Sequence, residues 1–183
     1  MRGATYAEQP EPQRLESGFS LIELLVVVAI ILIIAAIAIP NFLRAKMAAN
    51  GAAAAETIRT ITTASVIYST TWANGYPPSL DALGGIPPTA ASCDAAQLID
   101  PVVATTPYQK SGYIFALLPQ GAAVTAAPGC TPGYSAYLVA GAPATSNSGI
   151  DSYCSNEPGV IHYDVTGAVI ADPATCDALP ELQ

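Results

Sequence analysis

The fold of this chain is decided by residues 18–41, which read GFSLIELLVVVAIILIIAAIAIPN. Between residues 19 and 39 the only strongly polar side chains are those of Ser20 and Glu23. An α-helix rises about 1.5 Å per residue, so this run reaches roughly 31 Å, which matches the hydrocarbon core of a bilayer. The run has no polar face, so the helix must contact lipid or be surrounded by other helices. We therefore predict a membrane-length helix over residues 19–39.

Glu23 is the unusual residue of this run. An ionised carboxylate inside a bilayer costs on the order of 2.5–3.5 kcal/mol even on the lenient insertion scale. A simple membrane anchor has no use for such a residue. The alternative is that Glu23 lies close enough to the lipid headgroups to stay solvated, in which case it needs no function. The residues around Glu23 decide between these two interpretations.

The string GFSLIELLVV at residues 18–27, with its continuation AIAIPN at residues 36–41, resembles the class III prepilin signal of type IV pilins and type II secretion pseudopilins. This pattern requires a Gly/Phe junction, an acid at a fixed offset and an unbroken apolar run. The resemblance implies that a prepilin peptidase cleaves between Gly18 and Phe19 and methylates the new amine of Phe19. It also implies that Glu23 meets the N-terminal ammonium of a neighbouring subunit, since a buried charge is tolerated only when paired.

Residues 1–18 are then a leader peptide that cleavage removes. Glu16 and Ser17 stand where the family commonly has Lys or Arg, so the leader departs from the usual basic form. Ordinary secretory processing is the alternative. The apolar run is longer than the 7–15 residues of a secretory signal, but the small residues at 35–38 near its end resemble a signal cleavage site.

After Pro40 the sequence becomes amphipathic, and we expect the helix to continue through residues 40–72. A proline removes one backbone hydrogen bond and kinks or locally melts a helix. In the pilin family this proline is associated with a kink in the free subunit and local melting in the fibre, which the resemblance implies for Pro40. Alanines between residues 45 and 55 favour helix and allow close helix-to-helix contact.

One face of this second half is predicted to pack on a sheet. The breaker cluster NGYPP at residues 74–78 should end the helix near Trp72. Residues recurring at spacings of three and four form the predicted stripe: Ile58, Ile61, Ser65, Tyr68 and Trp72.

Residues 73–183 predict a globular head of the α+β class. The prolines and Gly84-Gly85 between residues 73 and 110 indicate a long irregular connection, with a short helical turn near Asp94–Ile99. Aromatic and β-branched runs bounded by Gly and Pro then predict antiparallel strands. The fold expected is therefore type IV pilin-like, a long N-terminal helix on a small antiparallel β-sheet. The expected strand pairs are 112–118 with 134–139, and 160–163 with 168–170 across a turn at 164–167.

The head contains all four cysteines, on the side of the apolar run that would be exported. An even count in that compartment predicts two disulfides, and the absence of a C-x-x-C spacing argues against a zinc or redox site. Four cysteines allow three pairings. We favour Cys93 with Cys130 and Cys154 with Cys176, because each pair closes a local loop and the second would pin the C-terminal tail.

Composition excludes several functions. The chain has 6 Lys+Arg against 14 Asp+Glu, a net charge of −8, and no basic run that would bind a nucleic-acid backbone. His162 lies in a predicted strand without a nucleophile at a recognisable spacing, so we assign it no catalytic role. The acids Asp164, Asp172 and Asp177 reproduce no calcium-binding loop. We predict no enzyme activity, no cofactor and no metal.

The combined prediction is a structural subunit that polymerises through its N-terminal helix into a type IV pilus-like filament on the cell surface. Its partners would be further copies of the chain, a prepilin peptidase and the inner-membrane assembly machinery. Before assembly it would be a single-pass protein of the bacterial inner membrane. The alternatives are a pseudopilin that drives protein export through a type II secretion system, an uncleaved membrane protein with an exported binding head, and a DNA-uptake pilin, which the acidic head makes less attractive.

Overall fold

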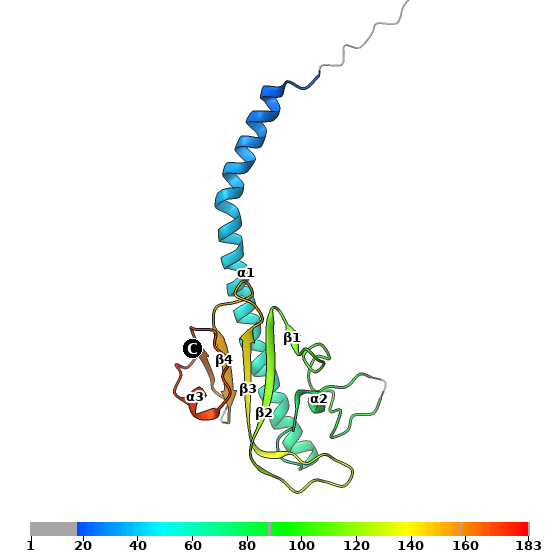
Figure 1. Ribbon diagram of the computed structural model, residues 1–183. Coiled ribbons are helices and arrows are strands. Elements are labelled where there is room, and N and C mark those ends of the chain that lie inside the picture. The colour runs from blue at the N-terminus through cyan, green and yellow to red at the C-terminus, as the bar shows by residue number, and fades with distance from the viewer. Residues whose placement is uncertain (1–17, 88, 158, 183) are drawn as a thin grey trace, which may run out of the picture. The chain divides into compact units, whose positions relative to one another are not determined.

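The computed structural model describes residues 18–87, 89–157 and 159–182. The leader predicted at residues 1–18 lies outside the described residues except for Gly18. The chain divides into two compact units, one ending at Pro40 and one beginning at Asn41. Helix α1, Leu21–Trp72, contributes to both units (Figure 1). It ends at Trp72, as the breaker cluster predicted.

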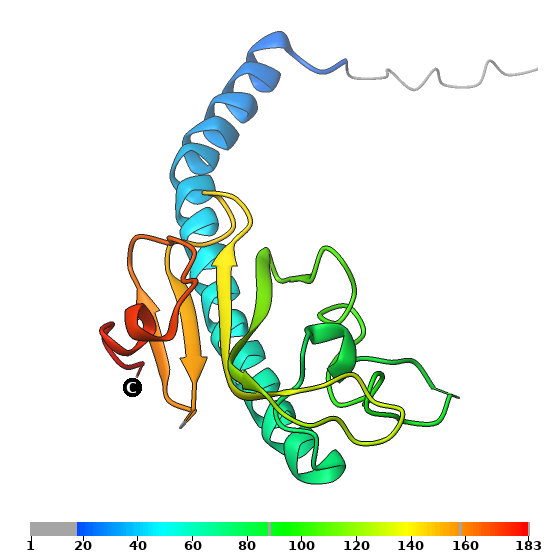
Figure 2. The same cartoon turned by 60° about the horizontal axis from the view of Figure 1, so that its bottom comes forward.

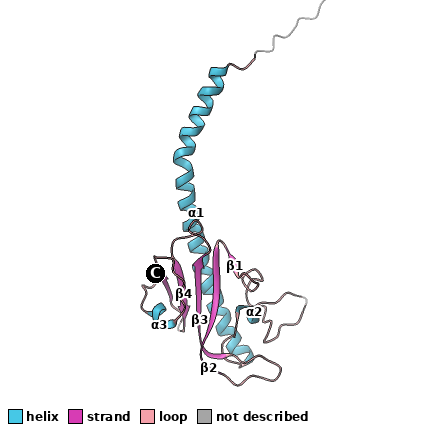
Figure 3. Ribbon diagram, in the orientation of Figure 1, coloured by secondary structure: helices cyan, strands magenta, loops and turns pink. Residues whose placement is uncertain are grey.

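The second unit is a five-stranded antiparallel sheet with the second half of α1 packed on one face. Figure 3 shows this helix against the sheet and the long connections between the remaining elements. The strand order is the chain order, β1-β2-β3-β4-β5. The predicted α+β, type IV pilin-like arrangement is therefore confirmed. The strands are β1 (Gln109–Lys110), β2 (Tyr113–Ala123), β3 (Tyr134–Pro143), β4 (Ser152–Asn156) and β5 (Ile161–Asp164).

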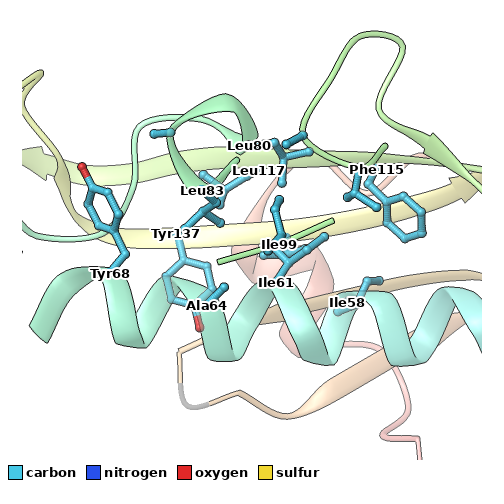
Figure 4. Packing of buried hydrophobic residues seen from close by; sticks show 14 of the residues in the cluster. Ile58, Ile61, Ala64, Tyr68, Leu80, Leu83, Ile99, Phe115, Leu117 and Tyr137 are labelled. Carbon is cyan, nitrogen blue, oxygen red and sulfur yellow. The ribbon is translucent and has the colours of Figure 1, made fainter. Parts of the chain in front are cut away.

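The predicted stripe of α1 faces the sheet. The side chains of Ile58, Ile61 and Tyr68 are 0% exposed, and Ser65 is equally buried, with its hydroxyl bonded to the carbonyl of Ile61. Figure 4 shows side chains of α1, α2 and the sheet meeting in one cluster. Burying such side chains contributes about 1.5–3 kcal/mol each, so this contact is a large share of the stability of the head.

The first predicted hairpin is correct and the second is wrong. β2 and β3 pair antiparallel, with Phe115 opposite Gly141. β5 exists as predicted, but its strand partner is β4, with Cys154 opposite His162, and residues 168–170 form no strand. Residues 168–170 leave the sheet after the turn, where Val169 is 77% exposed.

Two physical facts explain this difference. β4 reads SYCSN, and every residue in it is buried, so the strand has neither the alternation nor the apolar composition that marks a strand in sequence. The other side of β5 is occupied by the C-terminal tail instead of residues 168–170. The amide of Tyr163 donates to the carbonyl of Pro180 at 3.0 Å, and that of Leu182 donates to the carbonyl of Ile161 at 2.7 Å.

The short helix in the long connection is α2, Leu80–Leu83, and the helical turn predicted at residues 94–99 is wrong. Ser79, which directly follows Pro77-Pro78, caps α2: its side-chain oxygen accepts a hydrogen bond from the amide of Ala82. Serine is a preferred residue at this N-cap position. Residues 95–99 instead run beside α2, and the amide of Ala96 donates to the carbonyl of Ala82 at 2.8 Å. A third helix, α3 (Pro173–Asp177), was not predicted.

The two short helices lie at different edges of the sheet. The segment that carries α2 is beside the β1–β2 edge, and α3 is beside the β4–β5 edge (Figures 1 and 2). A second, smaller core lies under α3, on the sheet face away from α1. It contains Leu138, Cys154, Ile170 and Cys176. Neighbouring strand residues alternate between the two cores, because successive side chains of a strand point to opposite faces.

Candidate processing and assembly site

The residues around the predicted cleavage point are not helical. Gly18, Phe19 and Ser20 precede α1 and are exposed. A side chain built on Gly18 would meet no atom within 4 Å, and Phe19 is 80% exposed. The peptide bond between Gly18 and Phe19 is therefore accessible in the described residues and is not held in a helical hydrogen-bond ladder.

A hydrogen bond between Ser20 and Glu23 caps the N-terminus of α1. The Oε2 of Glu23 accepts the backbone amide of Ser20 at 2.9 Å, and the amide of Leu24 donates to the carbonyl of Ser20 at 3.2 Å. This is the glutamate half of a capping box, which satisfies one of the unpaired amides at a helix N-terminus. A carboxylate has about four acceptor positions, so this bond leaves Glu23 with capacity for a second donor.

The surroundings of Glu23 on the helix are apolar. A shallow depression of about 380 Å³ on one helix face is lined by Phe19, Ile22, Glu23, Val26 and Val27. Within α1, Glu23 and Val27 are four residues apart, the spacing that places two side chains on the same helix face, and Phe19 adjoins them from just before the helix. A charge on a surface of this kind is solvated in water but loses that solvation when lipid or another helix covers the face.

The first half of α1 exposes almost all its apolar side chains. Ile31, Ile33 and Ile37 are 58%, 64% and 67% exposed. Among the described residues, α1 alone is long and apolar enough to cross a membrane. A continuous apolar surface of this length marks a membrane or protein interface. α1 is helical through Pro40, although Pro40 cannot donate a hydrogen bond to the carbonyl of Ala36.

The head is held together by two disulfides, Cys93–Cys130 and Cys154–Cys176, the pairing favoured from the sequence. The first joins the connection after α2 to the β2–β3 loop. The second joins β4 to α3, and it therefore fixes the segment before the C-terminal tail.

Asn74 is a structural residue that sequence analysis placed only in a breaker cluster. It is 0% exposed, and its amide donates to the carbonyl of Thr131 at 2.7 Å and to the hydroxyl of Tyr68 at 3.3 Å. Its carbonyl oxygen accepts the amide of Ala127 at 3.1 Å. The hydroxyl of Tyr68 in turn donates to the carbonyl of Cys93 at 2.8 Å. Asn74 thus links the end of α1 to both sides of the first disulfide.

Two buried tyrosines of the head have strongly raised pKa values. Burial raises the pKa of Tyr113 to about 12, with smaller contributions from Tyr153 and Asp151. Burial likewise raises the pKa of Tyr137 to about 12, helped by Tyr76 and Glu157. These phenols are therefore neutral at physiological pH and act as packing and hydrogen-bonding groups.

The histidine and the acids considered for catalysis or calcium have structural partners. His162 Nδ1 lies 2.8 Å from the carbonyl oxygen of Leu179 in the C-terminal tail. Asp164 holds the turn after β5 through the amide of Thr166, and Asp172 caps α3 through Thr175. These bonds lower the pKa of both carboxyl groups. Asp177 accepts the side-chain amide of Asn156 at 2.8 Å. Within the described residues, no three metal-type side chains gather into one group.

Comparison with known families gives a match that overlaps the segment described above. Residues 13–39 match the prokaryotic N-terminal methylation motif. No curated protein and no solved structure matches the chain significantly. The motif covers Gly18, Phe19 and Glu23, and it points to a structural subunit rather than an enzyme. This match supports a class III prepilin signal, the signal of type IV pilins and pseudopilins.

Proposed function

We propose that the chain is a filament subunit that polymerises through residues 19–39 into a type IV pilus-like fibre on the cell surface. One observation carries this proposal. The methylation motif coincides with the half of α1 whose apolar side chains are exposed. Such a surface is costly in water, and a fibre of packed helices removes it from water after the subunit leaves the membrane.

In this proposal the chain has four functional segments. Residues 1–18 are the leader that a prepilin peptidase removes, and residues 19–39 anchor the precursor and later form the fibre core. Residues 40–72 carry the head on α1. Residues 73–183 form the exported head. The precursor is a single-pass protein of the bacterial inner membrane, from which the assembly machinery extracts it.

Glu23 supplies the assembly signal. Cleavage before Phe19 creates an ammonium at the N-terminus of α1, which is the positive end of the helix dipole, so this ammonium needs an anion. Glu23 of a neighbouring copy provides a full negative charge within an apolar surface. Each charge is costly alone in the fibre core and tolerable as a pair. The contact converts the insertion penalty of Glu23 into selectivity for a correctly placed second subunit.

The first test is the intact mass of the protein isolated from its own cells, measured under reducing and non-reducing conditions. We expect a chain that begins at N-methylated Phe19 and contains two disulfides. A chain that still begins at Met1 would support the uncleaved membrane protein instead. A chain cut after residue 39 would make it an ordinary secreted domain.

The second test is Glu23→Ala, with Glu23→Asp as the variant that keeps a carboxylate. Glu23→Ala should insert into the membrane normally, because it lowers the insertion cost, and should reduce the fibre yield by roughly tenfold or more. Glu23→Asp should retain a measurable part of the yield. Normal fibre yield from Glu23→Ala would contradict the proposed role.

The location of the fibres separates a pilus from a pseudopilus. Fibres sheared from the outside of cells support the pilus, which we propose. A processed subunit that is confined to the cell envelope and required for export of a secreted protein supports the pseudopilin. Both outcomes preserve the filament subunit and the role of Glu23.

A further inference from the structure

The charge pattern of α1 marks the point where its uncharged part ends. Residues 24–43 contain no charged side chain. At about 1.5 Å per residue this stretch spans roughly 30 Å of helix, the thickness of the hydrocarbon core of a bilayer. Its last two residues, Phe42 and Leu43, are apolar and are 68% and 46% exposed. Arg44 is therefore the first charged residue beyond a stretch that is long enough to cross a membrane.

Arg44 and Lys46 differ from the other Lys and Arg residues of the second unit, which are Arg59 and Lys110. Arg59 and Lys110 are each paired with a carboxylate, at 2.6 Å and 3.0 Å. Arg44 and Lys46 are exposed and form no salt bridge with any described residue. The two cations that lack a carboxylate partner are thus the two that follow the uncharged stretch most closely.

The second unit as a whole is acidic. It contains ten Asp and Glu residues against four Lys and Arg residues. A surface of anions therefore repels most of the unit and attracts it only where a cation stands without a carboxylate. Asp151 lines the same groove as Arg44, but no ion pair joins these two side chains. Among the described residues of the unit, only Arg44 and Lys46 meet this condition.

Arg44 and Lys46 point to different sides of α1. Residues two apart on a helix are separated by about 200° around its axis and do not face each other. Arg44 lines the groove that contains Tyr153, and Lys46 does not. One small anion therefore cannot be held by both side chains at once. A membrane surface can meet both, because the headgroups of a bilayer surround a helix that crosses it.

We propose that Arg44 and Lys46 bind the phosphates of anionic phospholipids on the exported side of the membrane. This inference rests on the proposed single-pass precursor and specifies the lipid class that surrounds it. The guanidinium of Arg44 matches the geometry of phosphate oxygens, and Lys46 acts as a point charge on another side of the helix. The apolar stems of both side chains lie along the lipid while their charged ends reach the headgroups. The contact holds the acidic head at the membrane until the subunit is extracted.

The test measures which lipids contact the full chain in a bilayer. The protein is isolated from its own cells and reconstituted in phosphatidylcholine vesicles that contain a trace of spin-labelled phosphatidylglycerol or spin-labelled phosphatidylcholine. Electron spin resonance gives the share of each labelled lipid that the protein immobilises. We expect the protein to favour the anionic lipid by about threefold or more at low salt. Sodium chloride at about 1 M should remove most of this preference, because it screens the charges.

Three double variants identify the residues that cause the preference. Arg44→Gln with Lys46→Gln should lower the preference for the anionic lipid by about twofold or more, because it removes both unpaired cations. Arg44→Lys with Lys46→Arg keeps both charges and should retain the preference. Arg59→Gln with Lys110→Gln removes the same amount of charge from the head, at positions that are paired with carboxylates, and should also retain it.

The outcomes separate this lipid contact from the proposed membrane anchor. A wild-type chain that does not float with the vesicles in a density gradient would overturn the single-pass precursor as well. An inserted chain whose lipid preference is unchanged by Arg44→Gln with Lys46→Gln, or falls equally in the Arg59 and Lys110 control, would overturn only the lipid contact. Release of the labelled lipid by millimolar inorganic phosphate, but not by sodium chloride of equal ionic strength, would assign the cations to a soluble phosphate instead.

Discussion

The two halves of α1 are one helix with opposite relations to water. Residues 21–40 expose their apolar side chains, and residues 41–72 bury a stripe of them on the sheet. Ile33 is 64% exposed and Ile61 is 0% exposed, although both are isoleucines in the same element. Helix formation is thus independent of which partner covers the apolar surface. The second half packs against the sheet of its own chain, and the first half requires lipid or other helices to cover its apolar surface.

This difference divides the energetics between folding and assembly. Side chains of the second half should control the stability of the head, and those of the first half should control insertion and fibre formation. The second unit contains both disulfides and both cores, and the described part of the first unit, residues 18–40, contains neither. Matched substitutions in the two halves of α1 test this division directly.

The largest effect is expected from Ile61→Ala. The substitution leaves a cavity between α1 and the sheet and should lower the free energy of unfolding of the head by about 2–5 kcal/mol. The matched change Ile33→Ala should alter it by less than about 0.5 kcal/mol. Denaturant unfolding of the full chain in detergent, followed by the fluorescence of Trp72, measures both. Equal destabilisation by the two variants would break the division of α1 into a folding half and an assembly half.

Removal of a disulfide should come next. The double variants Cys93→Ser/Cys130→Ser and Cys154→Ser/Cys176→Ser should each lose about 2–4 kcal/mol of stability, because each closed loop restricts the unfolded chain. The sequence separations are 37 and 22 residues, so the first pair should cost slightly more. The same unfolding measurement applies. A chain that loses no stability on reduction would show that the helix–sheet core alone holds the head.

The parts of the fold that the sequence predicted correctly are those whose physical signal is local. The apolar run, the stripe on α1 and the stop near Trp72 depend on spacing within one segment. The β2 and β3 strands are rich in aromatic and branched residues and have turn residues at their ends. In each case the residues that specify the element are close together in sequence.

The parts that the sequence did not predict depend on distant contacts. β4 is polar, and it is buried because β3, β5 and α3 surround it. The tail replaces residues 168–170 on β5 through backbone bonds that any side chain would permit. Asn74 is identified as a linking residue only by its bonds to Tyr68, Ala127 and Thr131. At the candidate site, the resemblance to the prepilin signal predicted roles for Gly18, Phe19 and Glu23, whereas the hydrogen bond from Ser20 to Glu23 was found only in the structure.

A smaller effect is expected at Gly141 of β3, which lies close to α1. A Cβ on Gly141 of β3 would lie 2.9 Å from the ring of Phe115 and 3.3 Å from Ile58. Gly141→Ala should therefore overpack this contact and cost about 1–3 kcal/mol. In the double variant with Phe115→Leu the two changes should cost less than the sum of their separate effects, because the smaller side chain makes room. Strict additivity would show that Gly141 does not limit the approach of helix and sheet.

The pH dependence of stability is a separate test, and it should again be confined to the head. Tyr113 and Tyr137 have a pKa of about 12 when folded, against 10 for an ordinary tyrosine. Below pH 10 both residues are neutral in both states, so their contribution to stability is complete. Between pH 10 and 12 the unfolded chain releases protons that the folded head retains, and the free energy of unfolding must fall as pH rises.

Urea unfolding at a series of pH values from 8 to 12 measures this decline. Tyr137→Phe removes one of the titrating groups and should make the decline shallower while keeping the ring in place. The first half of α1 contains no tyrosine, so the helical signal of that half in detergent should not change over the same range. If both halves of α1 lost structure together as the tyrosines ionised, the first half would depend on the folded head. The separation of folding from assembly would then fail.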